Sequence, residues 1–497
     1  MGSLKRFIKN NWIVLLIWLF ALTIRIVISI ISKGYTHPDE YYQSIEIAYE
    51  KVFGIGRIPW EFEEGIRSWV YPGIIIGIFK LMLFLGASNF ETLIIGVRLF
   101  SAFCSMISVV VSYYFAKYLF DKQTGIIATI FVSFWHDFIF WSGRAMGDSI
   151  AMNFVFLGCF LTFLCFPKKR KSGEIEEIEQ KKRLLFSLFA GINFGIAFMF
   201  KFGSIVVVIP FFIGLLLYKK WKEQLMLLGS ISFVIIIQGI IDQFTWGSFL
   251  HSAIEYLKFN IIEGSSSRFG VTPFLSYFAF IFDAYGEYLL LYVMFIILGI
   301  NFSKRNTILI STFFFYFLVF SFIGHKEYRF LLPVMPILVL FAAKGFGKYP
   351  TIIKKGSIKK PALVSMILVT IAFSCVNSCY LKTFKPNYQQ CLAMEWIGQQ
   401  PDCNLVILVD GGVFNLPGYA CLQNNATIEI ISAYNVDYIC YKYRHNIFYI
   451  LIKEHYYLDN YDFCNPAFAK YNVSLINTFY KTHFTNDPTV FVFKKFN

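Results

Sequence analysis

Two short polar segments carry the side chains best suited to chemistry. The first, residues 35–72, is rich in carboxylates, lies between two apolar runs and contains the sequence HPDEYYQ. Pro38 predicts a helix start, with Asp39 and Glu40 in the first turn. Such acids can simply complement a helix dipole, which contributes ~0.3–1 kcal/mol. Ionisable groups beside membrane-spanning sequence are costly, however, and usually mark a site, so we expect a carboxylate base here.

The second segment, residues 321–336, places His325, Lys326, Glu327 and Arg329 within five positions. Lys and Arg also anchor proteins at membrane surfaces, which is the simpler interpretation. So dense a cluster instead favours a cationic pocket for a lipid phosphate, where an arginine can form two parallel hydrogen bonds to an oxyanion. A third stretch, residues 260–273, adds Arg268 in a Gly/Ser-rich turn suited to a sugar or a phosphate.

Acids and cations together predict a reaction class. A carboxylate deprotonates an acceptor hydroxyl while cations stabilise a departing phosphate, which describes glycosyl transfer from a lipid-phosphate sugar. Such a leaving group does not oblige a metal. A lipid-linked-sugar transporter is the main alternative from another class, but its ionisable groups should lie near the membrane midplane in broken helices. A non-catalytic subunit of a transferase complex is a second alternative.

The elements that position these segments belong to a multi-pass membrane protein. Of 497 residues, 57% are hydrophobic and only 15% are charged, and the mean hydropathy is +0.58, which excludes an ordinary soluble enzyme. The apolar run Trp12–Ile31 predicts a retained first helix rather than a signal peptide. About ten to twelve spans are predicted in all, from further runs at 72–87, 92–118, 124–141, 148–166, 184–200, 202–218, 224–243, 276–300, 306–323, 330–346 and 361–379.

The net charge of +14 comes from short basic blocks between the apolar runs. This pattern is typical of cytoplasmic loops and not of a nucleic-acid-binding face. It places the loops 33–71, 245–275 and 324–329, together with residues 381–497, on the outer side of the membrane. Four apolar runs lie between the outer loop that ends near residue 72 and the cytoplasmic loop that begins near residue 167, but an odd number of spans is needed to connect opposite sides of the membrane. We therefore expect segment 124–141, which contains His136 and Asp137, to be re-entrant or interfacial.

Residues 381–497 differ from the membrane module, 1–380. The segment 405–419 reads as a buried strand that runs into a Gly-rich turn, and the runs 446–452 and 489–495 also read as strands, which predicts a small extracytoplasmic α/β domain. Gly411 and Gly412 predict a turn rather than a phosphate-binding loop. Seven of the ten cysteines lie in the last quarter, which fits one to three disulfides of undetermined pairing. Asn425 and Asn472 stand in sequons expected to be accessible, whereas Asn301 falls on the expected cytoplasmic side.

The two segments resemble a known family. The sequences HPDEYYQSIEIAYEKVFGIGRIPWEF and GIRSWVYPG resemble the first luminal loop of the GT22 family of GT-C glycosyltransferases, and HKEYRFLLPVMP resembles its second signature. The resemblance extends over residues 12–345. Members include the third and fourth mannosyltransferases of GPI-anchor assembly and the ER α-mannosyltransferases that extend lipid-linked oligosaccharides.

The resemblance implies an all-α polytopic GT-C fold that uses dolichyl-phosphate mannose, inverts the anomeric centre and needs neither metal nor cofactor. GPI assembly is the favoured pathway, with another lipid-linked or bacterial envelope glycan as the alternative acceptor. We expect a monomer in the ER membrane with a luminal site, or in the inner membrane with a periplasmic site if the chain is bacterial. The expected partners are the bilayer, the polyprenyl-phosphate donor and a glycolipid, without nucleic acid.

The resemblance also assigns roles to residues. The catalytic pair is Asp39 and Glu40, with Asp39 the preferred base. The expected donor-phosphate ligands are His325, Lys326, Arg329 and Arg67. The expected acceptor or sugar ligands are His37, Glu46, Trp60, Glu61, Arg268 and Glu327. In an ordinary α-helix, Glu46 would lie on the same face as Asp39, seven residues away.

Overall fold

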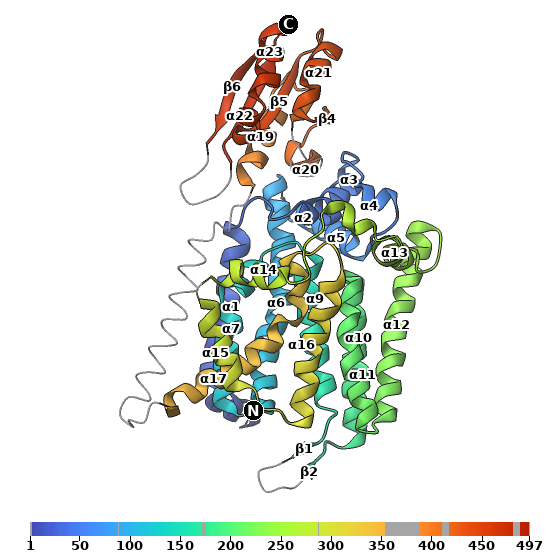
Figure 1. Cartoon of the computed structure of the whole chain (residues 1–497), viewed down its shortest axis with the longest axis vertical. Coiled ribbons are helices and arrows are strands. Elements are labelled where there is room, and N and C mark those ends of the chain that lie inside the picture. Colours follow the sequence, from blue (N-terminus) through green and yellow to red (C-terminus); the bar gives the residue numbers. More distant parts are fainter. Residues whose placement is uncertain are drawn as a thin grey trace. The chain divides into compact units, whose positions relative to one another are not determined.

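A computed structural model describes residues 2–87, 89–169, 175–286, 288–352, 387–409, 417–480 and 488–496 (Figure 1). The chain divides into two compact units. The helical unit comprises Met1–Val27, Glu64–Tyr71 and Leu99–Cys375. The mixed unit comprises Ile28–Glu63, Pro72–Arg98 and Val376–Asn497. The predicted boundary at residues 380 and 381 lies outside the described residues.

Long apolar helices confirm a multi-span membrane protein. Among the described residues, six helices are long and apolar enough to cross a membrane, or up to eight if each of two bent pairs is one span. The six segments are Asn11–Ile31 in α1 (Gly2–Ile31), α6 (Phe90–Leu119), α10 (Gln180–Phe200), α12 (Trp221–Trp246), α16 (Lys304–Phe322) and Tyr328–Lys348, formed by η5 (Tyr328–Val334) and α17 (Met335–Ile352). The bent pairs are α7 (Lys122–Phe134) with α8 (His136–Ser142), and α14 (Ser276–Tyr285) with α15 (Tyr288–Gly299).

This described part contains fewer long spans than the ten to twelve expected. Three of the apolar runs form helices shorter than 18 residues, which would cross ~30 Å of hydrocarbon only where the bilayer thins around them. They are α5 (Val70–Phe84), α9 (Gly147–Phe163) and the consecutive pair η2 (Phe202–Val207) and α11 (Val208–Leu217). The predicted run at 361–379 lies outside the described residues.

The segment expected to disturb the span count is indeed broken. Helix α7 ends at Phe134, Trp135 adopts an extended backbone with ψ 132°, and α8 begins at His136. The two helices differ in direction by 54°, as in a broken span or a re-entrant loop. The break places His136 Nε2 3.0 Å from the Ala284 carbonyl oxygen, and Asp137 accepts a hydrogen bond from Tyr328.

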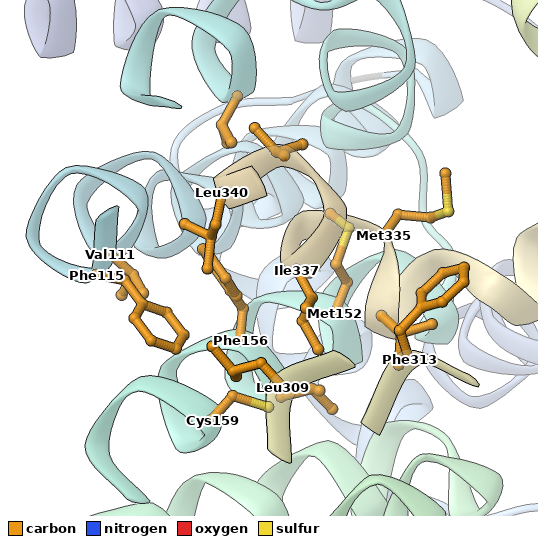
Figure 2. Close-up of a cluster of buried hydrophobic side chains, with 14 of the residues drawn as sticks. Val111, Phe115, Met152, Phe156, Cys159, Leu309, Phe313, Met335, Ile337 and Leu340 are labelled. Atoms are coloured by element: carbon orange, nitrogen blue, oxygen red, sulfur yellow. The ribbon is translucent and has the colours of Figure 1, made fainter. Parts of the chain in front are cut away.

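The core of the helical unit is formed by side chains from α6, α9, α16 and α17. Figure 2 shows Phe115 of α6, Phe156 of α9, Leu309 of α16 and Leu340 of α17 among the buried side chains of this core. Lipid tails are as apolar as these side chains, so close packing rather than escape from water holds such helices together. Arg25 of α1 adds polar ties, because its guanidinium donates to Ser105 Oγ at 2.8 Å and to the Val132 carbonyl at 2.9 Å.

The tail of the mixed unit contains a five-stranded sheet with the order β4-β3-β5-β7-β6. Strand β3 (Leu405–Val409) is parallel to β4 (Thr427–Ile431) and β5 (Phe448–Lys453), whereas β7 (Val490–Lys495) is antiparallel to β5 and β6 (Val473–Phe479). The predicted strands β3, β5 and β7 are confirmed, and β4 and β6 are additional. Gly411 and Gly412 lie outside the described residues.

Helices complete this α/β arrangement. Helices α21 (Val436–Lys442) and α23 (Tyr461–Lys470) share a buried cluster with Leu405, Ile407 and Val409 of β3. The intervening side chains of β3 point to the opposite face because side chains alternate along a strand. Helix α19 (Tyr388–Gly398) contacts β5, β6 and β7. The remaining elements are β1 (Lys168–Lys169), β2 (Ile175–Glu176), α13 (His251–Leu257), η3 (Lys258–Ile262), η4 (Ser265–Phe269), η7 (Ala433–Asn435) and α22 (Glu454–Asp459).

Candidate active site

The first polar segment of the mixed unit folds as three consecutive helical pieces. They are α2 (Pro38–Glu40), the π-helix η1 (Tyr41–Glu46) and α3 (Ile47–Phe53). Pro38 occupies the first helical turn as predicted, because its fixed φ suits that position and its missing N–H costs nothing there. His37 caps the helix, its Nδ1 accepting the Asp39 N–H at 3.1 Å. Gly54 ends α3 with a φ of 70°, in the left-handed region.

Asp39 and Glu40 have different environments in spite of being adjacent. The Asp39 side chain is 24% exposed, and its Oδ1 lies 3.5 Å from His37 Nδ1. Glu40 is 1% exposed, and its Oε2 accepts the Thr36 N–H at 2.7 Å. A partly exposed carboxylate is accessible to a substrate hydroxyl, whereas a buried, hydrogen-bonded one holds the chain that carries it. Asp39 is therefore the better placed of the two to take a proton.

Glu46 is a fully buried carboxylate that binds backbone groups. Its Oε1 accepts the N–H groups of Tyr419 at 2.9 Å and Arg57 at 3.2 Å, and its Oε2 accepts that of Ala420 at 3.0 Å. Burial raises the pKa of Glu46, and the three backbone donors oppose that rise. Two of these donors belong to the first turn of α20 (Tyr419–Leu422), so Glu46 joins the polar segment to α20 within the mixed unit.

Two further residues expected at the sugar lie in or beside α4 (Trp60–Glu63). Glu61 is 5% exposed, and its Oε1 accepts a hydrogen bond from Gln43 Nε2 at 2.8 Å. Trp60 is half-buried. Glu61 thus ties α4 to the π-helix, which makes its carboxylate a support for the segment.

A cleft of about 520 Å³ opens in the same unit beside these elements. Two charged side chains that line it, Arg57 and Glu63, make no ion pair with the residues that the structure describes. Tyr42 and Tyr419 add aromatic rings to the lining, and Glu429 adds a second carboxylate. Aromatic faces beside mixed charges are chemically suited to a polar, sugar-sized molecule.

The second polar segment, in the helical unit, is organised around Glu327. Arg329 Nε and Nη2 donate to its two carboxylate oxygens at 2.6 and 2.9 Å, and His325 Nε2 lies 2.9 Å from Oε1. The hydrogen bond to Glu327 raises the pKa of His325. Glu327 therefore orients a guanidinium and an imidazole, and the predicted grouping of His325, Glu327 and Arg329 is present in the structure.

Two residues that sequence reasoning missed complete this cluster. Lys201 Nζ lies 2.9 Å from Asp148 Oδ1, and Arg329 Nη1 lies 3.7 Å from Asp148 Oδ2. Lys201 also lies 4.3 Å from the centroid of the Phe330 ring. All three charged side chains are at most 12% exposed. The available signal was a single lysine between two apolar runs and an acid directly after SGRAMG, each an ionisable group within membrane sequence.

The remaining predicted cations occupy different places in the helical unit. Lys326 is 4% exposed and donates to the carbonyl oxygens of Thr272 at 2.9 Å and Gly324 at 3.4 Å, and burial lowers its pKa. It braces two loops. Arg67 lies 6.0 Å from the ring centroid of Tyr256. Arg268 is exposed at the end of η4.

Comparisons with known proteins agree with this picture. The model of the Alg9-like mannosyltransferase family matches residues 16–404. The "Mannosyltransferase APTG1" of Arabidopsis thaliana is 27% identical over 340 residues, which cover 67% of this chain and 58% of that protein. The "GPI alpha-1,2-mannosyltransferase 3" of Bos taurus is 27% identical over 360 residues, which cover 70% and 61%. This chain thus covers less than two thirds of the length of these relatives.

Solved structures share the fold. ArnT from Cupriavidus metallidurans bound to undecaprenyl phosphate superposes with a TM-score of 0.62 at 11% identity, over 97% of this chain and 98% of that one. The oligosaccharyltransferase of Archaeoglobus fulgidus gives a TM-score of 0.56 at 12% identity, over 89% and 68%. At such low identity these likenesses bear on architecture alone, and they confirm the GT-C expectation.

Proposed function

Because the chain belongs to the Alg9-like mannosyltransferase family, we propose that it transfers mannose from a polyprenyl-phosphate mannose to a hydroxyl group of a glycolipid. The observation that carries the proposal is the family match, which includes both polar segments. The proposed reaction is a single displacement that inverts the anomeric carbon. The acceptor oxygen attacks that carbon, the carbon–oxygen bond to phosphate breaks, and the polyprenyl phosphate departs.

In this proposal Asp39 is the general base. Its carboxylate is accessible, and the hydrogen bond that the Asp39 N–H donates to His37 Nδ1 fixes the backbone that carries it. Glu40 holds that backbone through Thr36. A positioned base contributes roughly 10²–10⁴-fold to a rate. We also propose that His37 and Trp60 contact the acceptor, as the family resemblance implies.

In this proposal the cations of the helical unit stabilise the negative charge that develops on the leaving phosphate. Arg329 offers a planar guanidinium fixed by Glu327, and Lys201 offers an ammonium fixed by Asp148. Their orientation before the reaction avoids a reorganisation cost as charge develops. His325 supplies a third positive charge when it is protonated. Arg67 and Arg268 remain proposed contacts to the donor or the acceptor, and Lys326 supports the loop that carries Arg268 through the Thr272 carbonyl.

The acceptor in this proposal is a GPI precursor that receives an α-1,2-linked mannose. Several relatives carry the name GPI mannosyltransferase 3, from mammals to Candida albicans. The donor is dolichyl-phosphate mannose, and ArnT, which shares the fold, was crystallised with a related polyprenyl phosphate. The proposed location is the endoplasmic reticulum membrane, with both polar segments on the luminal side.

Purified protein in detergent or liposomes tests the proposal. It is supplied with dolichyl-phosphate [³H]mannose and, separately, with GPI precursors that carry increasing numbers of mannoses and with lipid-linked oligosaccharides. We expect label in one GPI precursor only, in a product that an α-1,2-mannosidase releases. Label in a lipid-linked oligosaccharide would overturn the acceptor, and absence of label in every acceptor would overturn the transferase.

A further inference from the structure

Two cysteines of the mixed unit lie side by side on packed helices. Cys391 belongs to α19 and Cys421 to α20. The helices meet closely, since a side chain at Gly398 would collide with the backbone of Leu422. Asn424 Nδ2 also donates to the Gly398 carbonyl at 2.9 Å. Helices α19 and α20 therefore pack directly against each other.

The two cysteines share one cavity of the mixed unit. Cys391 and Cys421 both line a pocket of the mixed unit, together with Tyr41 and Tyr388. Burial raises the pKa of the Cys421 thiol, and the neighbouring Cys391 thiol raises it further. A disulfide needs Cα atoms about 4.4–6.8 Å apart and converging side chains, which two cysteines that line one pocket from packed helices can provide.

We propose that Cys391 and Cys421 form a disulfide bond, which selects one pairing among the five cysteines of residues 381–497. The inference rests on the proposed extracytoplasmic location of the tail, because disulfides persist in oxidising compartments and not in the cytosol. In the structure both residues are thiols.

The oxidant is an external disulfide, such as that of a thiol–disulfide oxidoreductase or of oxidised glutathione. The half-buried Cys391 loses its proton and attacks the external disulfide, which forms a mixed disulfide and releases one thiol. Cys421, which is buried, then loses its proton and attacks the Cys391 sulfur, which releases the second thiol. Two thiols of this chain are oxidised by two electrons, and one external disulfide is reduced to two thiols.

The bond would strengthen the support of the first polar segment. Helix α20 carries the Tyr419 and Ala420 N–H groups that hold Glu46, and the Cys421 N–H donates to the Tyr41 hydroxyl at 2.9 Å. A covalent link from α20 to α19 keeps these donors in place. It also closes a loop in the unfolded chain, which favours the folded state.

Peptide mapping of the full-length protein tests the pairing. Protein extracted from membranes into an alkylating agent is denatured and digested with a protease that cleaves after Glu and Asp. This choice matters because residues 391–421 contain Glu395, Asp402 and Asp410 but neither Lys nor Arg. A parallel sample of purified protein is first incubated with oxidised glutathione. Cys403→Ser is the matched control, since it removes a tail cysteine outside the pair.

We expect a peptide pair linking Cys391 to Cys421 in wild-type protein as extracted, separated by a reductant, retained in Cys403→Ser and absent from Cys391→Ser. Alkylation of both cysteines as extracted and again after glutathione treatment would overturn the pairing, as would a link from either cysteine to a different partner. A link that forms only with glutathione would overturn the extracytoplasmic location while the geometry of the pair stands, so the two failures are distinguishable.

Discussion

Glu40 is 1% exposed and hydrogen-bonded to the Thr36 N–H, whereas the neighbouring Asp39 keeps 24% of its side chain exposed. The family resemblance favours Asp39 as the base, but the sequence offers no physical ground for separating the two acids. The helix that starts at Pro38 separates them, because consecutive positions of a helix point about 100° apart. One carboxylate faces the interior and supports the backbone, and the other remains accessible for proton transfer.

Replacement of Glu46 should destabilise the protein. Glu46→Ala leaves the buried N–H groups of Arg57, Tyr419 and Ala420 without their acceptor, and each unsatisfied group costs about 1–3 kcal/mol. We expect a clear drop in the thermal unfolding midpoint in detergent, measured by fluorescence. Glu64→Ala, at an exposed glutamate, is the control and should unfold like wild type. Equal midpoints for the two variants would contradict the role of Glu46.

Transfer should fall as pH rises through the pKa of His325. The hydrogen bond to Glu327 raises that pKa above the ordinary ~6.5. The attraction between His325 and Glu327 is thus fully present below pH ~6.5 and is lost as pH rises through the raised value. The measurement is kcat/KM for the donor against pH. His325→Gln should abolish this basic limb, while His455→Gln, at an exposed histidine, should keep it. A limb unchanged in His325→Gln would contradict the assignment.

Lys201 should contribute to donor binding although it lies far from Arg329 in sequence. Lys201→Met removes a cation that Asp148 holds at 2.9 Å, and we expect KM for the donor to rise about 10–100-fold, or ~1.4–2.8 kcal/mol. Because Asp148 contacts both Lys201 and Arg329, the effects of Lys201→Met and Asp148→Asn should not add. Lys80→Met, at an exposed lysine of α5, is the control. Additive effects would indicate that the two residues act separately.

Glycan occupancy tests the orientation of the chain. Asn425, Asn472 and Asn301 are all exposed and all stand in sequons, but only the first two are expected on the luminal side. In a eukaryotic host, we expect a glycan at Asn425 or Asn472 and none at Asn301. A glycosidase that converts each glycosylated Asn to Asp is used in water labelled with oxygen-18, so that every occupied site carries a mass tag. A tag at Asn301 would invert the proposed topology.

Local signals in the sequence predicted much of the fold. Pro38 predicted the start of a helix, and the polar residues His136 and Asp137 within an apolar run predicted the broken segment. Both features could be predicted because each depends only on neighbouring residues. The strand β3 is an uninterrupted apolar run, as expected for a buried parallel strand. Strands β4 and β6 were missed because most of their side chains are not buried, so their pattern does not stand out.

Long-range relationships could not be read in this way. The contact between Glu46 and Ala420 joins residues 374 positions apart, and no feature of either segment predicts the other. The π-helix at Tyr41–Glu46 also changes which side chains share a face of the helix, because its hydrogen bonds join residues five apart rather than four. Glu46, which α-helical spacing would place on the face of Asp39, is fully buried instead. Likewise, nothing in the sequence links Asp148 and Lys201 to Arg329, and only the fold brings the three residues together.

The most direct test of the account compares mannose transfer by Asp39→Asn and Glu40→Gln with that of wild type. Dolichyl-phosphate [³H]mannose and the preferred GPI precursor are used at saturation, and donor binding and unfolding midpoints are measured in parallel. We expect Asp39→Asn to lose about 10²–10⁴-fold in kcat with donor binding and stability unchanged, and Glu40→Gln to lose mainly stability. Transfer by Asp39→Asn at the wild-type rate would contradict the assignment of Asp39 as the base.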